Sequence, residues 1–320
     1  MIVTLTANPS IDRTVVLGGR LVRGGVARST GATAQAGGKG VNISRAAVAA
    51  GVPTLAVLPA DEVFVAELGG AGIECRTRLP AGPVRVNLTL TEPDGTTTKI
   101  NHPGPVADRR LLDGLRDDVV SLAGDADWVV LAGSLPPGAP DAWYAELVVD
   151  LRATGARIAV DTSGPPLAEL AAALPAAAPD LMKPNGDELA SLTAADAVRL
   201  EADHRAAADA ALELVGRGVG AVLVTLGAGG AVLATPDGAW HAPAPATEVV
   251  STVGAGDSSL FGYLLASERG LPPEERLAHA VAYGSAAAGL PGTTIPRPSD
   301  VGPASVRPVR LQVGRPAPTT

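Results

Sequence analysis

From about Leu111 onward, segments with helical periodicity alternate with short apolar runs, and this alternation restricts the fold more than any other feature of the sequence. The first pair is a helical stripe over residues 111–122, followed by a buried strand at 128–132. Strands that alternate with helices form a parallel sheet covered on both faces. The pattern continues with predicted helices at 143–152, 185–192, 194–217 and about 273–288, and strands at 157–161, 180–183 and 221–226. We therefore expect an α/β fold with a three-layer α/β/α core, whose ligands bind beyond the carboxyl ends of the strands.

The early part of the chain does not follow this alternation. Segments 11–36 and 83–104 are mostly extended, and they interrupt the first helix–strand units. Within the second segment, apolar residues alternate with Arg85, Asn87 and Thr89, as in a half-buried strand. We predict that the two segments form a small β-sheet lid over the ligand, and that the core consists of residues 1–10, 37–82 and 105–320.

Composition excludes several classes of function. With 320 residues, of which 46% are hydrophobic, the chain is long enough for one large core. The formal net charge of -8, without a basic stripe, argues against nucleic acid or an anionic membrane as a partner. The single cysteine, Cys75, leaves no disulfide framework and no zinc cluster. Because the N-terminus lacks a charged leader and no apolar run reaches transmembrane length, we expect a soluble, cytoplasmic protein.

The stretch Ser251–Ser259 combines a turn of very small residues with the start of an apolar-periodic helix. Gly254, Ala255 and Gly256 leave several backbone N–H groups unpaired, and the helix dipole adds positive charge, so the turn can hold an anion. Asp257 follows in the first helical turn. Phosphoryl transfer needs both features, namely donors for the moving phosphoryl group and a carboxylate for the attacking hydroxyl. Taken alone, the stretch also fits a helix cap after a flexible loop.

A second glycine-rich stretch, Gly37-Gly38-Lys39-Gly40-Val41-Asn42, opens another predicted helix. Lys39 and Asn42 are three residues apart and so share one helical face, where they can grip a phosphate and a sugar hydroxyl. The stretch is not a Walker A loop, because Thr33 occupies the position of the first glycine and Gly40 follows the lysine. The alternative is a helix-entry turn with a solvated lysine.

Polar residues on the predicted lid can also face the ligand. Arg85 and Asn87 lie on one face of their strand, and Arg85 can offer a fork of donors to a phosphate. Asp12, just after the first strand, is either a turn residue or a partner for sugar hydroxyls. A simply solvated polar face is the alternative for the arginine and the asparagine.

The segment Lys183–Glu188 closes one predicted strand and opens a helix. Asn185 and Glu188 have the spacing of a capping box. The functional alternative places Asn185 and Glu188 near a hydrated Mg²⁺ and Lys183 near a nucleotide phosphate.

The glycine turn Thr225–Gly230 can border a nucleotide or can simply close a hairpin. Neither this turn nor the one at Gly254 completes the G-x-G-x-x-G pattern, because Val232 and Ser259 occupy the last position. A dinucleotide site, and with it an NAD-dependent oxidoreductase, is therefore disfavoured.

In their order along the chain and in their residues, these motifs together resemble the ribokinase/PfkB family of sugar kinases over nearly the whole chain. Two family signatures match Ala36–Asn42 and Val253–Ser258, and its N-x-x-E element matches Asn185–Glu188. The resemblance implies an ATP- and Mg²⁺-dependent kinase with a ribokinase-like core and a β lid. The chain departs from the family at Pro59–Phe64, where a glycine-rich loop is usual, and at Ala132, where serine is common.

The resemblance also implies roles for individual residues. Asp257 would be the catalytic base, with the amides of Gly254, Ala255 and Gly256 as the anion hole. The phosphosugar would be held by Asp12, Gly37, Gly38, Lys39, Asn42, Arg85, Asn87 and Ser134. ATP would be bordered by Lys183, Asn185, Thr225, Gly227, Gly229, Gly254, Gly256 and Ser285, and Mg²⁺ by Glu188 and Asn185 through water.

Three segments, Thr4–Asp12, Gly133–Pro136 and Ser251–Gly254, most resemble the family members that convert fructose 1-phosphate to fructose 1,6-bisphosphate. The main alternative substrate is tagatose 6-phosphate, because a furanose with a carbinol at each end is nearly symmetric. A non-catalytic sensor of nucleotide or sugar phosphate on the same fold is a second alternative. The expected partners are a phosphosugar and ATP, and a homodimer formed through the lid is compatible with the resemblance.

Overall fold

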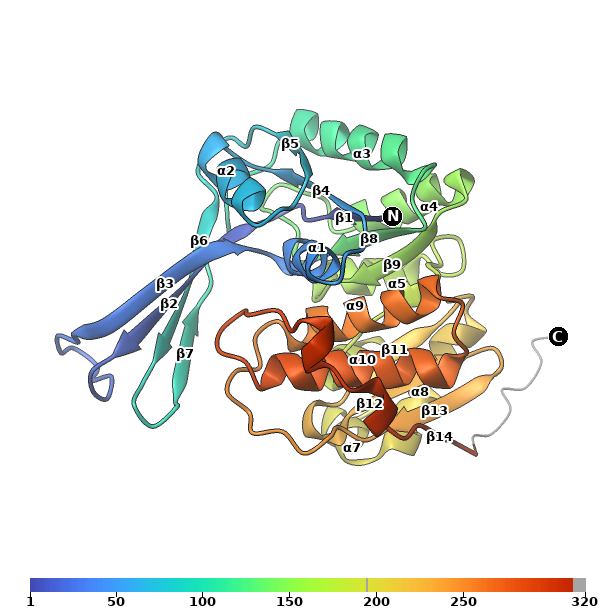
Figure 1. Ribbon diagram of the computed structural model, residues 1–320. Helices are drawn as coiled ribbons and strands as arrows, with labels where there is room; N and C mark the ends of the chain where they lie inside the picture. The colour runs from blue at the N-terminus through green and yellow to red at the C-terminus, as the bar shows by residue number, and fades with distance from the viewer. Residues whose placement is uncertain (194, 313–320) are drawn as a thin grey trace.

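The computed structural model describes residues 1–193 and 195–312, and its centre is a ten-stranded twisted sheet between two layers of helices (Figure 1). The order is β14-β13-β12-β11-β10-β9-β8-β1-β4-β5. From β5 to β11 neighbouring strands are parallel, and β12 to β14 are added antiparallel at one edge. The strands are β1 (Ile2–Leu5), β4 (Thr54–Pro59), β5 (Cys75–Arg78), β8 (Trp128–Ala132), β9 (Arg157–Asp161), β10 (Leu181–Met182), β11 (Val222–Thr225), β12 (Ala231–Thr235), β13 (Gly238–Ala242) and β14 (Val309–Arg310). The predicted α/β/α core with a mostly parallel sheet is confirmed.

Alternating side chains of the central strands supply both cores. In β1, Ile2 packs into one apolar cluster, while Val3 and Leu5 pack into the cluster on the opposite face. Every residue of β1 and β8 is buried. Because both faces of these strands are covered, they are nearly continuous apolar runs, as the sequence indicated for residues 128–132.

Helices from distant parts of the chain cover each face. One face packs against α3 (Arg109–Ala123), α4 (Trp143–Leu151), α5 (Pro165–Ala172), α6 (Gly186–Leu192), α7 (Ala197–Ala202) and α8 (His204–Gly216). The other face packs against α1 (Lys39–Ala49), α2 (Glu62–Gly70), α9 (Ala255–Glu268) and α10 (Pro273–Ala288). No helix in the described part of the chain is long and apolar enough to cross a bilayer.

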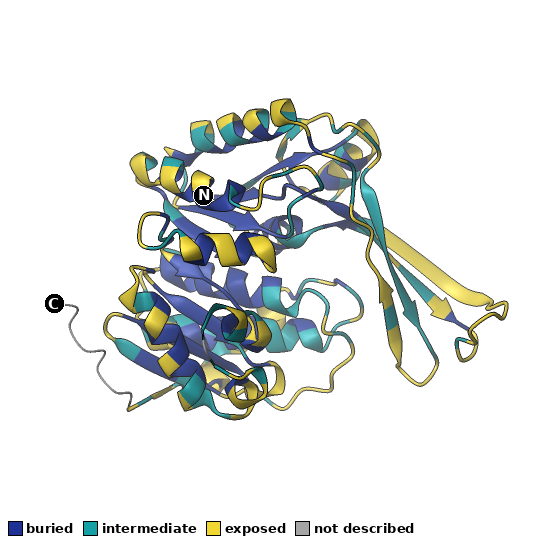
Figure 2. Ribbon diagram, turned by 180° about the vertical axis from the view of Figure 1, so that it is seen from behind, coloured by how far each residue is buried: buried dark blue, intermediate teal, exposed yellow. Residues whose placement is uncertain are grey.

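A second, four-stranded sheet extends away from this core (Figure 1). Its order is β3-β2-β6-β7, with β2 and β6 parallel and both outer strands antiparallel. The strands are β2 (Ser10–Leu17), β3 (Ser29–Gly37), β6 (Arg85–Thr91) and β7 (Thr97–Ile100). Most of its residues are exposed or half-buried, in contrast to the dark interior of the core (Figure 2). The sheet uses the two predicted extended segments; its separation from the core as a lid domain stays a prediction.

Some local predictions were wrong. Instead of one helix over 194–217 there are two, because the Asp203 side chain caps α8 and ends the preceding helix; residue 194 itself lies outside the described residues. The alternation of strands and helices predicts that Val253 lies at the carboxyl end of a strand, but residues 243–254 form a loop between β13 and α9. Sequence periodicity gave no signal for short elements such as α5 and β14, which follow from tertiary packing. The one-turn segments η1 to η4 lie at Arg152–Thr154, Gly227–Gly229, Pro298–Asp300 and Pro303–Ser305.

Candidate active site

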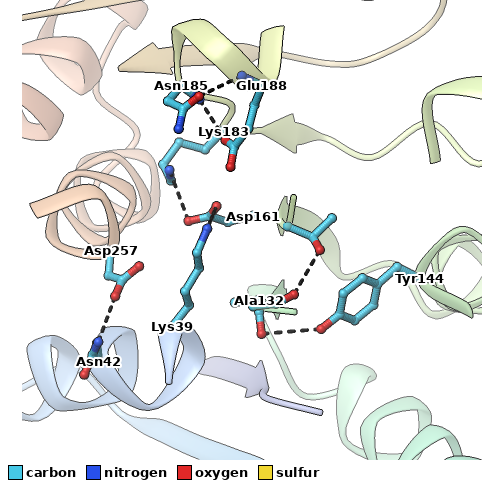
Figure 3. A network of polar contacts seen from close by, with 11 residues as sticks. Lys39, Asn42, Ala132, Tyr144, Asp161, Lys183, Asn185, Glu188 and Asp257 are labelled. Carbon is cyan, nitrogen blue, oxygen red and sulfur yellow. Dashed lines mark hydrogen bonds and ion pairs between the residues drawn. The ribbon is translucent and has the colours of Figure 1, made fainter. Parts of the chain in front are cut away.

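Two helix N-termini meet at Asp257 (Figure 3). Gly254 precedes α9 in a left-handed conformation, with φ of 78°, which an L side chain rarely adopts. The Asp257 side chain lies in the first turn of α9, and its residue is only 7% exposed. It accepts a hydrogen bond of 2.8 Å from Nδ2 of Asn42, which comes from α1. The structure therefore brings together the predicted base and one residue of the predicted sugar site. Among the described residues, the N–H groups of Ala255, Gly256 and Asp257 at the start of α9 have no hydrogen-bond acceptor, so they can bind an anion.

A fully buried carboxylate, Asp161, lies beside this pair at the carboxyl end of β9. Lys39 donates a hydrogen bond of 2.6 Å from Nζ to Asp161 Oδ1. Lys183 Nζ lies 3.1 Å from Asp161 Oδ2 and forms a second ion pair with this carboxylate. The Lys183 ammonium also lies near Gly256, where an added Cβ would be 3.4 Å from Nζ. Two ammonium groups and two carboxylates thus lie close together (Figure 3), with Lys39 half-buried and the other three residues buried.

Charge and burial shift the protonation of these groups. Burial, and then the charge of Asp161, raise the pKa of Asp257 to about 6, although Lys39, Asn42 and Lys183 oppose the shift. Burial likewise opposes the charge of Asp161, but Lys183 and Lys39 hold the pKa of Asp161 below its ordinary value. For Lys39, burial favours the neutral amine, yet attraction to Asp161 and Asp257 outweighs it and raises the pKa. A carboxylate with a pKa near neutrality is suited to accept a proton.

Three predicted lid residues lie close together at the root of the small sheet. Asp12 and Asn87 are opposite each other across β2 and β6, and Asn87 Nδ2 donates to Asp12 Oδ1 at 3.1 Å. Arg85 Nη2 donates to the Asn8 carbonyl at 3.0 Å and to Ser134 Oγ at 3.3 Å. Ser134 follows Gly133, whose added Cβ would lie 4.0 Å from Cβ of Lys39, so the lid residues and the lysine border the same site.

Unpartnered polar atoms gather here. Eleven buried side-chain nitrogen or oxygen atoms of the described residues have no hydrogen-bond partner, and five of them that also lack an ion pair belong to this region. Such an atom costs about 1–3 kcal/mol, so a cluster of them indicates a place where a polar ligand binds. The five atoms are Thr6 Oγ1, Asn8 Oδ1, Asn42 Oδ1, Arg85 Nε and Asn87 Oδ1.

The glycines before α1 are required by the protein's own packing. An added Cβ on Gly37 would lie 2.2 Å from Asp12 Oδ2, and one on Gly38 would lie 2.8 Å from Cγ2 of Thr6. Gly38 also has φ of 116°. The missing side chains at Gly37 and Gly38 thus make room for Asp12 and Thr6 against the start of α1.

The predicted nucleotide residues occupy neighbouring strand ends. Asn185 and Thr225 form a parallel bridge, and Thr225 N donates to the Pro184 carbonyl at 3.1 Å. Gly227 and Gly229 follow in the turn η2, whose Gly229 carbonyl lies 2.8 Å from Nε2 of His241. These residues continue from Lys183 along the same edge of the sheet.

Ser285 lies apart from this group, half-buried on α10. Its neighbour Gly284 packs on the start of α9, with an added Cβ 3.2 Å from Cβ of Ser259. Among the described residues, no hydrogen bond joins Ser285 to the other predicted nucleotide residues. Its role stays a prediction.

Asn185 and Glu188 form the capping box of α6. Asn185 Oδ1 accepts from the Glu188 amide at 2.7 Å, and Glu188 Oε2 accepts from the Asn185 amide at 2.9 Å. Oε1 of Glu188 makes no hydrogen bond with the described residues, and the Glu188 charge acts on Lys39. No group of three or more His, Cys, Asp or Glu side chains within 1–193 and 195–312 could hold a metal. The residues fit a hydrated Mg²⁺ held by one carboxylate and by nucleotide phosphates.

Asp161 is the site residue that sequence reasoning missed. It closes the apolar run 157–161 at the carboxyl edge of the sheet, the same position that singled out Lys183. A polar residue that ends a buried parallel strand is therefore the signal that could have found it.

Comparison with known proteins agrees with this geometry. Residues 6–300 match the model of the pfkB family carbohydrate kinases. The chain belongs to this family. It is 38% identical to a 1-phosphofructokinase of Rhodobacter capsulatus over 93% of each chain. It is equally similar to a 1-phosphofructokinase of Haloferax volcanii, over 94% of this chain and 95% of the relative. The structure of phosphofructokinase-2 from Escherichia coli in complex with substrates and products aligns with a TM-score of 0.82 and 29% identity, covering 93% of this chain and 96% of the other.

The chain is therefore a sugar kinase, and as a kinase of this family it uses ATP. The expectations for family, fold and enzyme class are confirmed, and the non-catalytic sensor is not supported. The individual roles of the site residues stay predictions, which the geometry above makes specific.

Proposed function

We propose that this kinase transfers the γ-phosphoryl group of ATP to O6 of fructose 1-phosphate and forms fructose 1,6-bisphosphate. The observation that carries the chemistry is the meeting of buried Asp257 with Asn42 and with the two lysines on Asp161. The 38% identity to enzymes named 1-phosphofructokinase supports the choice of sugar.

In this proposal Asp257 accepts the proton of the O6 hydroxyl. Because burial raises its pKa to about 6, it is mostly ionised near neutral pH and still basic enough to take the proton. The hydroxyl oxygen forms a bond to the γ-phosphorus while the bond from that phosphorus to the bridging oxygen of ADP breaks. The N–H groups after Gly254 and the ammonium groups of Lys39 and Lys183 stabilise the charge on the moving phosphoryl group.

The lid residues would hold the sugar. Arg85 presents its unpartnered Nε, and its guanidinium already lies on Ser134, so it is suited to bind the 1-phosphate. Asp12 and Asn87, paired across β2 and β6, face the hydroxyls of the ring. Held at one end by its phosphate, the furanose places its other carbinol at Asp257.

Mg²⁺ would be held by the open oxygen of Glu188 and by ATP, with Asn185 contributing through water. When bound, the ion neutralises charge on the phosphates of ATP. Glu188→Gln keeps a capping-box residue at this position, so we expect α6 to persist while the Mg²⁺ concentration for half-maximal activity rises about tenfold. Asp187→Asn, on the exposed neighbour in the same helical turn, is the matched control.

The function is tested by ADP release with a panel of sugars: fructose 1-phosphate, tagatose 6-phosphate, fructose 6-phosphate and the unphosphorylated sugars. We expect the highest kcat/KM with fructose 1-phosphate, and a product whose phosphorus spectrum shows two phosphate esters. A clear preference for tagatose 6-phosphate would replace the proposed substrate and keep the chemistry. ADP release with none of the phosphosugars would refute the proposal.

We also propose that the small sheet pairs two copies of the chain, in a cytoplasmic enzyme. On the face opposite Asp12 and Asn87, the half-exposed side chains of Val15, Leu88 and Leu90 lie on neighbouring strands, and no helix of the described chain packs over them (Figure 1). Such a face favours association. Leu88→Asp should halve the mass measured by sedimentation; an unchanged mass would exclude this interface.

A further inference from the structure

Asp161 has the features of a residue that organises the site without contacting the sugar. Its side chain is completely buried and takes part in two ion pairs, with Lys39 from α1 and with Lys183 after β10. The two lysines come from parts of the chain 144 positions apart in numbering, and Asp161 is the group that both of them contact. Figure 3 shows the carboxylate between the two ammonium groups, with Asp257 to one side.

A buried ion pair is not explained by stability alone. Desolvation of the charges offsets most of the Coulomb attraction, and well-packed apolar residues often replace such pairs without loss of stability. The arrangement holds two cations near each other and beside Asp257, and this costs folding free energy. A role of these charges in the reaction explains why the protein keeps them. Phosphoryl transfer does use it, because negative charge passes between nucleotide and acceptor.

We propose that Asp161 is the positioning residue of the kinase reaction: it fixes the ammonium groups of Lys39 and Lys183 toward the moving phosphoryl group, and its charge keeps Asp257 ready to accept a proton. The inference rests on the proposed function and adds a residue to it. The fixed distances of 2.6 and 3.1 Å supply the geometry, and the nearby negative charge supplies the electrostatic effect.

The electrostatic effect gives the proposal a specific readout. The charged groups that act on Asp257 are Asp161 from β9, Lys39 from α1 and Lys183 after β10. Asp161 raises the pKa of Asp257, whereas the two lysines lower it. Without the charge of Asp161 the lysines act on Asp257 alone. The acidic limb of kcat/KM should therefore move to lower pH.

The experiment compares Asp161→Asn with Asp118→Asn in the full-length enzyme. Asp118 is another buried aspartate, paired bidentately with Arg78 on β5 at 2.6 Å, and it belongs to the core away from the site. We expect Asp161→Asn to lower kcat about 100-fold, because a displacement of reacting groups by about 1 Å has an effect of this order. The KM values should change less. Its acidic limb should move down by about one pH unit. Asp118→Asn should lower thermal stability and leave the acidic limb in place.

Asp161→Glu separates charge from position and remains informative if Asp161→Asn does not fold. The glutamate keeps the charge but displaces both lysines, so kcat should fall while the acidic limb stays near that of the unchanged enzyme. An acidic limb that moves equally in both variants, or in neither, would overturn the proposal. Full recovery of Asp161→Asn at high Mg²⁺ would overturn it too, since it would assign the carboxylate to metal binding. Turnover of fructose 1-phosphate by the unchanged enzyme tests the proposed function separately.

Discussion

The two halves of the site differ in how completely their polar groups are paired. On the large sheet, Asp257, Asp161 and Lys183 are buried and Lys39 is half-buried, and each of the four has a hydrogen-bond or ion-pair partner before any ligand arrives. On the small sheet, Arg85 and Asn87 are only half-buried and keep unpartnered atoms. The difference suggests a division of labour: groups that stabilise the reacting charges are held rigidly by the core, whereas groups that recognise the sugar are completed by the ligand. Substitutions on the two sheets should therefore affect different kinetic constants.

The largest effect is expected for Asp257→Asn. The amide can keep the contact with Asn42 but cannot accept the hydroxyl proton, so kcat should fall by about 10²- to 10⁴-fold. ATP binding should change little, because the N–H groups of the turn remain. Single-turnover kinetics and nucleotide titration measure the two quantities. A variant with near-normal kcat would show that Asp257 is not the base and would remove the proposed contrast between the sheets.

On the small sheet, Arg85→Ala should raise KM for the phosphosugar by about 10- to 100-fold and change kcat much less. The reason is the loss of charge-assisted hydrogen bonds worth about 1.5–3 kcal/mol to a bound phosphate. Arg109→Ala is the control, because the Arg109 side chain is 93% exposed at the start of α3. Steady-state kinetics with varied phosphosugar at saturating ATP measures kcat and KM for both variants. If kcat falls as steeply as affinity, the small sheet takes part in the chemical step.

A smaller effect is expected for Gly37→Ala. The added methyl would lie 2.2 Å from Asp12 Oδ2, so the carboxylate must turn away and lose its contact with Asn87. KM for the sugar should rise several-fold, by about the value of one hydrogen bond. Gly31→Ala on the same strand is the matched control, since nothing lies within 4 Å of its added Cβ. Equal kinetics for the two variants would show that Asp12 does not contact the sugar.

How much the sequence could predict also differs between the two sheets. The apolar run at residues 128–132 predicts β8 well, because a strand buried on both faces must be apolar. The glycine-rich motifs placed Asp257 and Lys39 at helix starts, because glycines in a turn before an apolar-periodic run mark where a helix begins. Sequence spacing could not reveal that Lys39 points to Asp161, since the partner lies 122 residues away. It could not reveal that Gly37 is required by Asp12 either, because that contact depends on how β2 pairs with β3.

The smallest effect concerns stability, and it has opposite signs for the two buried carboxylates. The folded state raises the pKa of Asp257 to about 6 from 3.8, so between these values the native protein holds more protons than the unfolded chain and loses stability as pH rises. Asp257→Asn should therefore raise Tm by a few °C near pH 7.5, and this gain should vanish as pH falls below about 4. The pKa of Asp161 is lowered, so its charge stabilises the fold at neutral pH, and Asp161→Asn should lower Tm there. Thermal unfolding of both variants at several pH values measures the signs. A loss of stability in Asp257→Asn at neutral pH would mean that neighbouring charges stabilise ionised Asp257, as they do Asp161. The fold would then not raise the pKa of Asp257 toward that of a catalytic base.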